Sequence, residues 1–364
     1  MSAGHARVSR CTQQCVQGGD AVSGGHTVSL ACETTLSHDE HMRYRTFGRL
    51  GWQVSEVGYG MWGLAAWTGS DDELTRSALD EAVRLGCNFF DTAWAYGSGA
   101  SERILGDLIR AHSDKRLFTA TKVPPKNLTW PSRRGFTLEE VFPPDHIRRY
   151  VESSLENMGV ESVDLLQFHV WEDAWANDDR WQRVIHDLVR QRFIGGVGVS
   201  INRWEPENAL ATLRTGLIDA VQVIYNIFDQ APEDELFPLC RELGVAVIAR
   251  VPFDEGSLTG NLTRESRFPA GDFRSIYFGP ENLGPTMDRV DVLRSLVPDG
   301  STLPEVALRF ILANSDVATV IPGMRRPAHV QANIRASDRG PLDAGVVAQL
   351  RPHRWDREPT SWSL

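Results

Sequence analysis

The sequence predicts an α/β fold, a (β/α)₈ TIM barrel with an N-terminal β-hairpin and extended loops at its C-terminal face. Three observations lead to this prediction. Short apolar runs recur along the chain, segments with helical periodicity alternate with them, and eight such pairs follow one another. The runs are nearly continuous and rich in β-branched residues, which is typical of parallel strands buried on both faces.

The apolar runs give the expected barrel strands. Before the first of them, Arg45–Val54 has the pattern of a short hairpin, which we expect to close the bottom of the barrel. The eight expected strands are Val54–Tyr59, Asn88–Ala93, Leu117–Val123, Val163–Val170, Gly195–Ile201, Ala220–Asn226, Val245–Pro252 and Val317–Pro322.

Helices are expected between these strands. In Asp145–Met158 the apolar residues recur at helical spacing, and the segment stops at Gly159, a residue suited to a helix C-terminus. Several other segments begin with proline, whose missing N–H costs least at a helix start. The other expected helices are Asp71–Leu85, Ser101–Ala111, Asp178–Arg192, Pro206–Thr215, Pro232–Leu243, Leu303–Ala313, Pro327–Ala336 and Leu342–Leu350.

Two long segments interrupt this alternation. Pro124–Pro144 follows the third strand, and Phe253–Gly300 follows the seventh. Loops after barrel strands lie on the catalytic face, so these segments are candidates for a lid and a substrate loop. The alternative is that both are inert insertions.

Composition excludes several partner classes. The chain has 364 residues and a formal net charge of −10, which argues against nucleic acid or an anionic membrane as a partner. No apolar run is long enough to span a bilayer. We expect residues 1–42, which are polar, to form a disordered tail and residues 43–364 to form the barrel.

Cysteine usage gives no metal site. Cys11 and Cys15 have a loose ligand-like spacing, but no matching Cys or His pair follows, so no metal is predicted. Cys87 and Cys240 are isolated and expected to be buried. This pattern fits a cytoplasmic protein.

A glycine-rich segment after the first strand has two interpretations. Gly58, Gly60 and Gly63 match the fingerprint of a dinucleotide-binding Rossmann fold. A helix should open within that fingerprint, but helical periodicity begins only at Asp71, and a Rossmann sheet does not predict eight repeated units. We therefore expect a loop whose small residues, Gly60 among them, allow a cofactor to approach closely.

The candidate catalytic residues follow consecutive strands. Asp91 and Tyr96 end the second strand and its loop, Lys122 ends the third, and His169 ends the fourth. Barrel geometry brings these strand ends to one mouth. Singly, each residue has an ordinary alternative: a helix cap for the Asp, a surface charge for the Lys and a core residue for the His. Their coincidence favours a functional set.

Such a set suits carbonyl reduction, which needs a hydride on carbon and a proton on oxygen. The pKa of a free tyrosine, ~10, is too high for ready proton exchange at neutral pH. A lysine held by Asp91 would stabilise the phenolate and lower the pKa of Tyr96, which would then act as a general acid. His169 would orient the substrate oxygen by a hydrogen bond.

These motifs resemble the aldo-keto reductase superfamily over roughly Tyr44 to Ala336. The similarity rests on the F-D-T-A-x-x-Y-G segment at Phe90–Gly97, the T-K pair ending at Lys122, the Q-x-H triplet ending at His169, Gly198–Asn202 and Val320–Gly323. The resemblance implies a (β/α)₈ fold without a Rossmann domain and an extended nicotinamide cofactor. It also implies a catalytic tetrad of Asp91, Tyr96, Lys122 and His169.

The resemblance also implies cofactor contacts. Ser200 and Gln222 correspond to ligands of the nicotinamide carboxamide, and Tyr225 is placed to stack on the nicotinamide ring. Asn202 is displaced by one residue from the family's asparagine, because Ile201 intervenes. After the seventh strand, the family's pyrophosphate loop corresponds to Pro252, Phe253, Gly256, Leu258 and Gly260, with Asp254 and Glu255 as an acidic departure.

The end of the eighth strand bears on the choice of coenzyme. Arg325 and Arg326 precede the expected helix at Pro327, and a helix N-terminus beside two arginines suits a ribose 2′-phosphate. The alternative is that they are solvated loop charges. We expect NADP(H) rather than NAD(H). The cofactor contacts expected in this region are Ile321, Gly323, Met324, Arg325, Arg326, His329 and Asn333.

The function expected is therefore NADP(H)-dependent reduction of aldehydes or ketones, with a small carbonyl compound as the partner. Candidate substrate contacts are Trp62, Trp94, Trp130 and Trp171, which indicate an apolar, planar or sugar-like substrate. One alternative is a non-catalytic or regulatory NADPH-binding module of the same fold. Another is a metal-dependent lyase or isomerase, which the lack of a metal motif disfavours. The sequence leaves the oligomeric state open.

Overall fold

A computed structural model describes residues 42–64, 72–269 and 271–357 of the chain. The predicted tail, with Cys11, Cys15 and Cys32, lies outside these residues except for Met42. Among the helices of the described residues, none is both long and apolar enough to cross a membrane.

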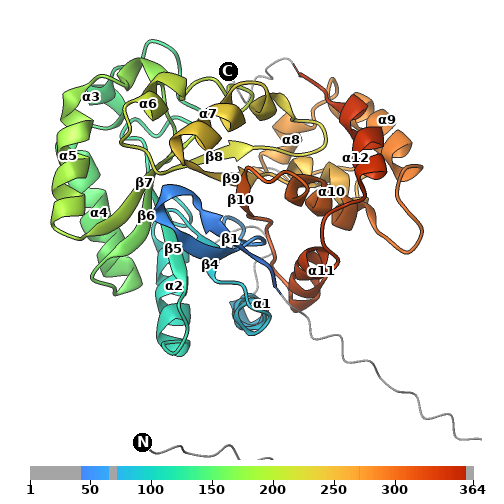
Figure 1. Ribbon diagram of the computed structural model, residues 1–364, viewed down its shortest axis with the longest axis horizontal. Coiled ribbons are helices and arrows are strands. Elements are labelled where there is room, and N and C mark those ends of the chain that lie inside the picture. The colour runs from blue at the N-terminus through green and yellow to red at the C-terminus, as the bar shows by residue number, and fades with distance from the viewer. Residues whose placement is uncertain (1–41, 65–71, 270, 358–364) are drawn as a thin grey trace, which may run out of the picture. The chain divides into compact units, whose positions relative to one another are not determined.

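Eight parallel strands form the barrel (Figure 1). Each strand pairs with the next along the chain, and isolated bridges from Val57 to Val320 and from Gly60 to Gly323 join the two edges. The predicted (β/α)₈ fold is thus confirmed. The strands are β3 (Tyr59–Gly60), β4 (Phe89–Asp91), β5 (Phe118–Val123), β6 (Val163–Phe168), β7 (Ile194–Ser200), β8 (Ala220–Ile224), β9 (Ala246–Arg250) and β10 (Val317–Val320).

Helices surround the strands (Figure 1). Most lie where the periodicity predicted them, whereas α3, α8 and α9 fall in the two long segments that were expected to be loops. The helices are α1 (Asp72–Arg84), α2 (Ala100–Ala111), α3 (Leu138–Val141), α4 (Pro144–Met158), α5 (Asp179–Arg190), α6 (Leu210–Arg214), α7 (Leu236–Leu243), α8 (Arg274–Tyr277), α9 (Leu283–Arg294), α10 (Leu303–Leu312), α11 (Pro327–Asp338) and α12 (Ala344–Leu350). Short 3₁₀ turns include η3 (Ala231–Glu233) and η4 (Asp254–Thr259).

An antiparallel hairpin, β1 (Tyr44–Phe47) and β2 (Trp52–Ser55), closes one end of the barrel as predicted. Phe47 and Val54 are fully buried in a cluster with Phe89, and the same cluster includes apolar side chains of β5, β6, β8 and β9. The first expected strand, Val54–Tyr59, is therefore wrong in extent. Val54 pairs within the hairpin, and β3, which pairs with β4, is only two residues long.

Strand alternation sets the positions of the functional side chains. Because successive side chains in a strand point to opposite faces, residues two apart share a face. Ala246 and Ile248 lie in the interior cluster at the closed end, as do Ala220 and Leu165. Two residues further along β8 and β6, the inward positions are occupied by the polar residues Gln222 and Gln167. The barrel therefore has an apolar base beside the hairpin and a polar layer nearer its C-terminal mouth.

Candidate active site

Lys122 lies at the centre of the predicted tetrad. Its Nζ atom donates to Asp91 Oδ2 at 2.6 Å, to the carbonyl oxygen of Thr92 at 2.8 Å and to the Tyr96 hydroxyl at 3.4 Å. The Lys122 and Asp91 side chains are almost completely buried, with 1% and 3% of their surface exposed. Residues from the ends of β4 and β5 and from the following loop thus meet at one point, as the sequence predicted.

Two glutamines hold Asp91 in place. Gln167 Nε2 and Gln222 Nε2 donate to Asp91 Oδ1 at 2.9 and 2.8 Å, while Oδ2 faces Lys122. Gln222 also donates to Gln167 Oε1 at 3.2 Å. Its amide N–H₂ group is therefore engaged by the tetrad itself, a contact that sequence reasoning did not foresee. The sequence assigned no role to Gln167 beyond its place in the Q-x-H triplet.

The pKa values of the pair follow from burial and charge. Burial alone lowers the pKa of Lys122, but the charges of Asp91 and Tyr96 and their hydrogen bonds raise it above its ordinary value. Burial raises the pKa of Tyr96, and Lys122 opposes this effect without overcoming it. Tyr96 is therefore held as a protonated phenol beside a charged ammonium, so the expected net lowering of its pKa is not observed here.

His169 lies beside Tyr96, with ring centroids 5.7 Å apart and the planes near perpendicular. Its Nδ1 atom is buried and has no hydrogen-bond partner among the described residues. Burial, with the charges of Lys122 and Arg250, lowers the pKa of His169 well below its ordinary value. The imidazole is therefore neutral, and its Nδ1 is a buried polar atom without a partner among the described residues.

The four predicted substrate tryptophans fall into two groups. Trp62 and Trp130 are exposed over 43% and 38% of their surface. Trp62 packs edge-on against Phe273. The ring centroid of Trp130 is 5.8 Å from that of His169. Trp130 therefore lies at the candidate site, and Trp62 presents an aromatic surface to solvent.

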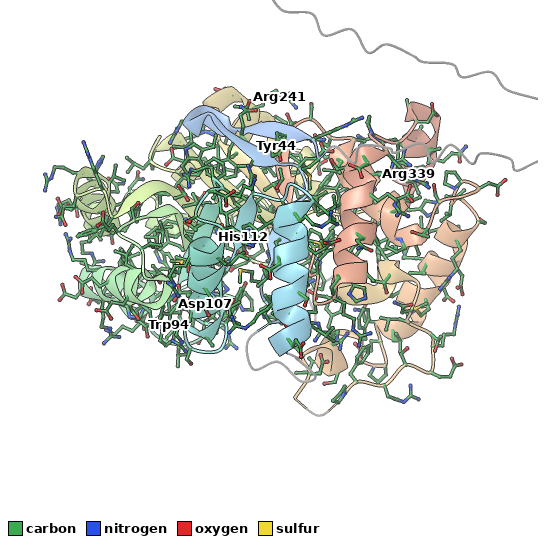
Figure 2. All side chains as sticks on the ribbon, turned by 90° about the horizontal axis from the view of Figure 1, so that it is seen from below. Tyr44, Trp94, Asp107, His112, Arg241 and Arg339 are labelled. Atoms are coloured by element: carbon green, nitrogen blue, oxygen red, sulfur yellow. The ribbon has the colours of Figure 1, made fainter. Side chains whose placement is uncertain are left out.

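Trp94 and Trp171 both contact helices of the outer ring. Trp94 donates to Ser153 of α4 and packs against Tyr150 of the same helix, and it lies at the opposite end of the molecule from Tyr44 of the hairpin (Figure 2). Trp171 is fully buried and donates to Thr212 of α6. Trp171 is thus enclosed by protein, whereas Trp94 is half-buried and its contact with substrate stays a prediction.

Two predicted cofactor contacts are also engaged elsewhere. Tyr225 is buried, donates to Glu233 of η3 and packs against aromatic rings of α7 and α10, so it cannot stack on a ring at the mouth. Asn202 accepts from the Ser132 N–H at 3.3 Å, and its Nδ2 donates to Trp171 O and Glu172. Its side-chain amide therefore joins three loops, and both its Oδ1 and its Nδ2 atoms already have partners within the protein.

Comparison with known proteins identifies the fold's relatives. A model of the aldo/keto reductase family matches residues 56–354. This chain belongs to the aldo/keto reductase family.

Several named relatives are oxidoreductases. The chain is 28% identical over 310 residues to an NADH-specific methylglyoxal reductase of Escherichia coli, covering 81% of this chain and 93% of that protein. It resembles a solved aldo-keto reductase from Bacillus halodurans in its holo form, with a TM-score of 0.69, 26% identity, and coverage of 89% and 100%. It also resembles a glycerol dehydrogenase from Gluconobacter oxydans, with a TM-score of 0.69, 27% identity, and coverage of 85% and 94%.

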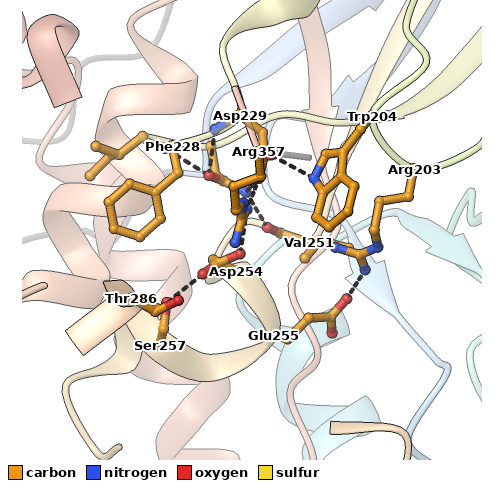
Figure 3. Close-up of polar contacts among 12 residues, drawn as sticks. Arg203, Trp204, Phe228, Asp229, Val251, Asp254, Glu255, Ser257, Thr286 and Arg357 are labelled. Carbon is orange, nitrogen blue, oxygen red and sulfur yellow. Dashed lines mark hydrogen bonds and ion pairs between the residues drawn. The ribbon is translucent and has the colours of Figure 1, made fainter. Parts of the chain in front are cut away.

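In this aldo/keto reductase the loop after β9 carries its acidic residues in internal ion pairs (Figure 3). Glu255 pairs with Arg203, whose side chain is 2% exposed, and Asp254 pairs with Arg357 at 2.8 Å. The negative charges of Asp254 and Glu255 are thus neutralised by arginines of the protein. Of the other predicted contacts, Gly256 has open space where a Cβ would lie, Leu258 is fully buried, and Pro252 and Phe253 lead into η4.

Arg357 connects the C-terminal segment to two loops of the barrel mouth. Its Nη2 donates at 2.8 Å to Asp229, after β8, and to Asp254, after β9 (Figure 3). Its Nη1 donates to Tyr277. Its side chain is 3% exposed. Ser257 donates to the other Asp254 oxygen at 2.7 Å. This network, with all members buried, fixes the start of η4.

The segment after β10 fits the expected cofactor contacts only in part. Met324 is fully buried and its carbonyl accepts from Tyr59, and the Ile321 side chain packs in the barrel interior. Only the backbone of these residues can therefore face a ligand. Gly60 donates its N–H to Pro322 O at 3.0 Å and helps to join β3 to β10, whereas Gly323 is exposed with open space around it.

A cationic group surrounds the start of α11. Arg326 is the N-cap residue, Pro327 is the first residue of the helix, and Arg325 is half-buried. The pKa of His329 is lowered by burial and by the charges of both arginines, so the three side chains lie near one another. Asn333 lies on the same helix and is buried. This end of the barrel therefore presents positive charge and free helix N–H groups.

Sequence reasoning missed Arg250, the last residue of β9. Its Nη2 donates to Ile201 O at 3.1 Å, and its Nε is buried without a partner. Period-2 alternation from Ala246 and Ile248, both interior, would have indicated that Arg250 points into the barrel mouth.

The described residues contain no group of three His, Cys, Asp or Glu side chains able to hold a metal ion. Cys87 and Cys240 are buried free thiols, as predicted.

Proposed function

We propose that this protein reduces an aldehyde or ketone with a reduced nicotinamide dinucleotide, and that Tyr96 is the proton donor. The observation that carries the proposal is the position of Lys122 Nζ between Asp91 and the Tyr96 hydroxyl, with His169 beside the same phenol. An ion pair buried this deeply costs desolvation energy, and titratable groups with perturbed pKa values cluster at functional sites.

The residues divide the work of carbonyl reduction. A reduced nicotinamide bound at the mouth would supply the hydride that the carbonyl carbon receives. Tyr96 gives its proton to the carbonyl oxygen, and the adjacent Lys122 ammonium stabilises the phenolate that remains. Neutral His169 donates a hydrogen bond that orients the same oxygen. A proton from water restores the phenol, so the product is an alcohol.

The chain's own groups fit such a coenzyme. Arg325 and Arg326 flank the N-terminus of α11, where N–H groups and cationic side chains favour a phosphate. The orphaned Nε of Arg250 lies at the mouth of the barrel. We infer that the coenzyme is NADP(H), because a 2′-phosphate would engage the two arginines. One relative is NADH-specific, so this inference rests on Arg325 and Arg326 and not on the family.

The exposed aromatic surface suggests the substrate class. Trp130 lies beside His169, and Trp62 packs on Phe273. Flat apolar side chains at a mouth favour a planar or apolar carbonyl compound over a strongly charged one.

The test is a Tyr96→Phe variant. We expect it to lose carbonyl reduction by at least about 10²-fold, the usual share of a general acid, while still binding NADPH. Binding is measured by quenching of protein fluorescence with NADPH and NADH, and turnover by loss of nicotinamide absorbance over a panel of aldehydes and ketones.

Three results would contradict parts of this proposal. Near-normal turnover by Tyr96→Phe would remove the assignment of the acid. Tighter binding of NADH than NADPH would remove the inference from Arg325 and Arg326. Tight NADPH binding by the wild type without turnover of any carbonyl would favour the non-catalytic module instead.

A further inference from the structure

Arg250 is a cation at the mouth of the barrel without a matching anion. It ends β9, where it is in register with Ile224 of β8, and two residues earlier Ile248 belongs to the interior cluster. Its side chain reaches past β8, and Nη2 donates at 3.1 Å to the carbonyl oxygen of Ile201, the residue after β7. Arg250 therefore spans the ends of the two strands that carry Gln222 and Ser200.

The nearby carboxylates are already engaged. Asp91 faces Lys122 and two glutamines, and Glu255 pairs with Arg203. Among the described residues Arg250 makes no ion pair, and its Nε is buried without any hydrogen-bond partner. Lys122 and Arg250 thus contribute two positive charges, against the one negative charge of Asp91.

The charge of Arg250 affects the pKa values of two residues of the tetrad. It contributes to lowering the pKa of His169 and, as the smallest of several influences, opposes the rise in the pKa of Tyr96. Burial, followed by repulsion from Arg203, lowers the pKa of Arg250 itself to about 10. The guanidinium is still charged at neutral pH, so the site keeps its excess positive charge there.

The charge of a nicotinamide ring depends on its oxidation state, so the affinities of its two forms are sensitive to the excess positive charge of the site. The oxidised ring carries one positive charge, and it becomes neutral when it gains a hydride, which is two electrons and one proton. The phosphates are the same in both forms. A difference in affinity between the two forms therefore reports the interaction of the ring charge with its surroundings.

We propose that Arg250 lies beside the nicotinamide ring and makes the site bind the reduced coenzyme more tightly than the oxidised one. The inference rests on the proposed function, because only a ring placed to deliver hydride near Tyr96 would lie between Arg250 and the tetrad. A planar guanidinium packs well against a neutral ring and repels a cationic one. The result is release of oxidised coenzyme after each reduction.

The experiment compares the dissociation constants of NADPH and NADP⁺ by isothermal titration in the wild type, Arg250→Met and Arg250→Lys. Methionine keeps an unbranched side chain without charge, and lysine keeps the charge. We expect the wild type to favour NADPH by about tenfold. Arg250→Met should lose most of that preference, chiefly through tighter binding of NADP⁺, and Arg250→Lys should retain it.

A matched control is Arg241→Met, which removes an exposed arginine at the hairpin end of the molecule (Figure 2) and should leave the ratio unchanged. Circular dichroism checks that each variant is folded. If Arg250→Met weakens both forms equally, or leaves the ratio unaltered, the inference is overturned.

Two further outcomes separate the possible failures. If Arg250→Met raises KM for a carboxylated benzaldehyde but not for its methyl ester, and the coenzyme ratio is unaltered, Arg250 serves a substrate anion and the inference is wrong. If the wild type binds no nicotinamide dinucleotide, the proposed function itself fails. The titration therefore distinguishes the two.

Discussion

Tyr96 is subject to opposing influences whose balance can be measured. Burial raises its pKa above the ordinary value of about 10, the Lys122 charge lowers it, and the Asp91 charge raises it again. The net direction is upward. Reduction requires the protonated phenol, whereas oxidation of an alcohol requires the phenolate.

Reduction should therefore be independent of Tyr96 ionisation at neutral pH. We expect kcat/KM for reduction to stay level until the pH passes the ordinary tyrosine pKa, and to fall above it. Oxidation of an alcohol should instead increase with pH over the whole range in which the protein is stable. Both are read from pH profiles of initial rate. A reduction limb that falls between pH 6 and 8 would show that another group titrates.

The positions of the candidate catalytic residues could be predicted from the sequence, whereas those of several neighbouring side chains could not. Asp91, Tyr96 and Lys122 could be placed because they follow consecutive strands. Tyr225 was placed wrongly: Gln222 points inward, so strand alternation puts Tyr225 on the outward face, where it packs against α7 and α10. Arg250 was missed because it was taken as part of an apolar strand.

Among elements, η4 depends on a residue far away in the chain. Arg357 bonds Asp254 at the start of η4, and Asp229 in the preceding loop. Because all three side chains are nearly inaccessible to water, removing the arginine leaves two carboxylates buried without a counter-charge.

We expect Arg357→Met to lower the free energy of unfolding by about 3–5 kcal/mol, the usual cost of breaking a buried pair from one side. If η4 contacts the coenzyme, the Kd of NADPH should rise as well. Urea unfolding and fluorescence titration measure the two effects.

The control is Arg354→Met on the same segment. Its pairs with Asp234 and Asp356 lie at the surface, so it should cost no more than about 1 kcal/mol. Equal losses in the two variants would contradict the role assigned to Arg357.

The helix α9 shows why sequence reasoning missed helices within the two long segments. The helix α9 buries Leu283, Met287, Val290 and Leu293, which is helical spacing. It was nonetheless expected to be part of the long loop Phe253–Gly300, in which Gly284 and Pro285 stand at the start of α9. Proline is tolerated in the first turn of a helix, so the apolar spacing was the better guide.

At the level of the whole molecule, the apolar cluster that includes the hairpin and the polar residues of the candidate active site lie at opposite ends of the barrel. The hairpin side chains Phe47 and Val54 fill the base, whereas the tetrad occupies the polar layer toward the mouth. This separation is typical of barrel enzymes, in which loops at the C-terminal face vary without disturbing the core. It also explains why the fold could be predicted from periodicity while the substrate could not: the base follows regular strand patterns, and the mouth is made of loops.

Phe47→Ala tests this separation. Phe47 is fully buried and stacks on Trp52 with ring centroids 5.4 Å apart, and it lies equally close to Phe89. Its truncation opens a cavity at the closed base, so we expect a loss of about 3–5 kcal/mol in the free energy of unfolding. The Kd of NADPH and the kcat of the folded variant should stay within about twofold of wild type, since distant, independent sites combine additively.

The matched variant in the same hairpin is Tyr44→Ala. Tyr44 is 47% exposed and its hydroxyl donates to Gly86 O at 2.9 Å, so the loss should be about 1 kcal/mol. Urea unfolding in parallel with coenzyme titration measures both quantities on one sample. A Phe47→Ala protein that is folded but has lost coenzyme affinity would mean that the base and the mouth are mechanically coupled, because the variant changes no group within the polar layer.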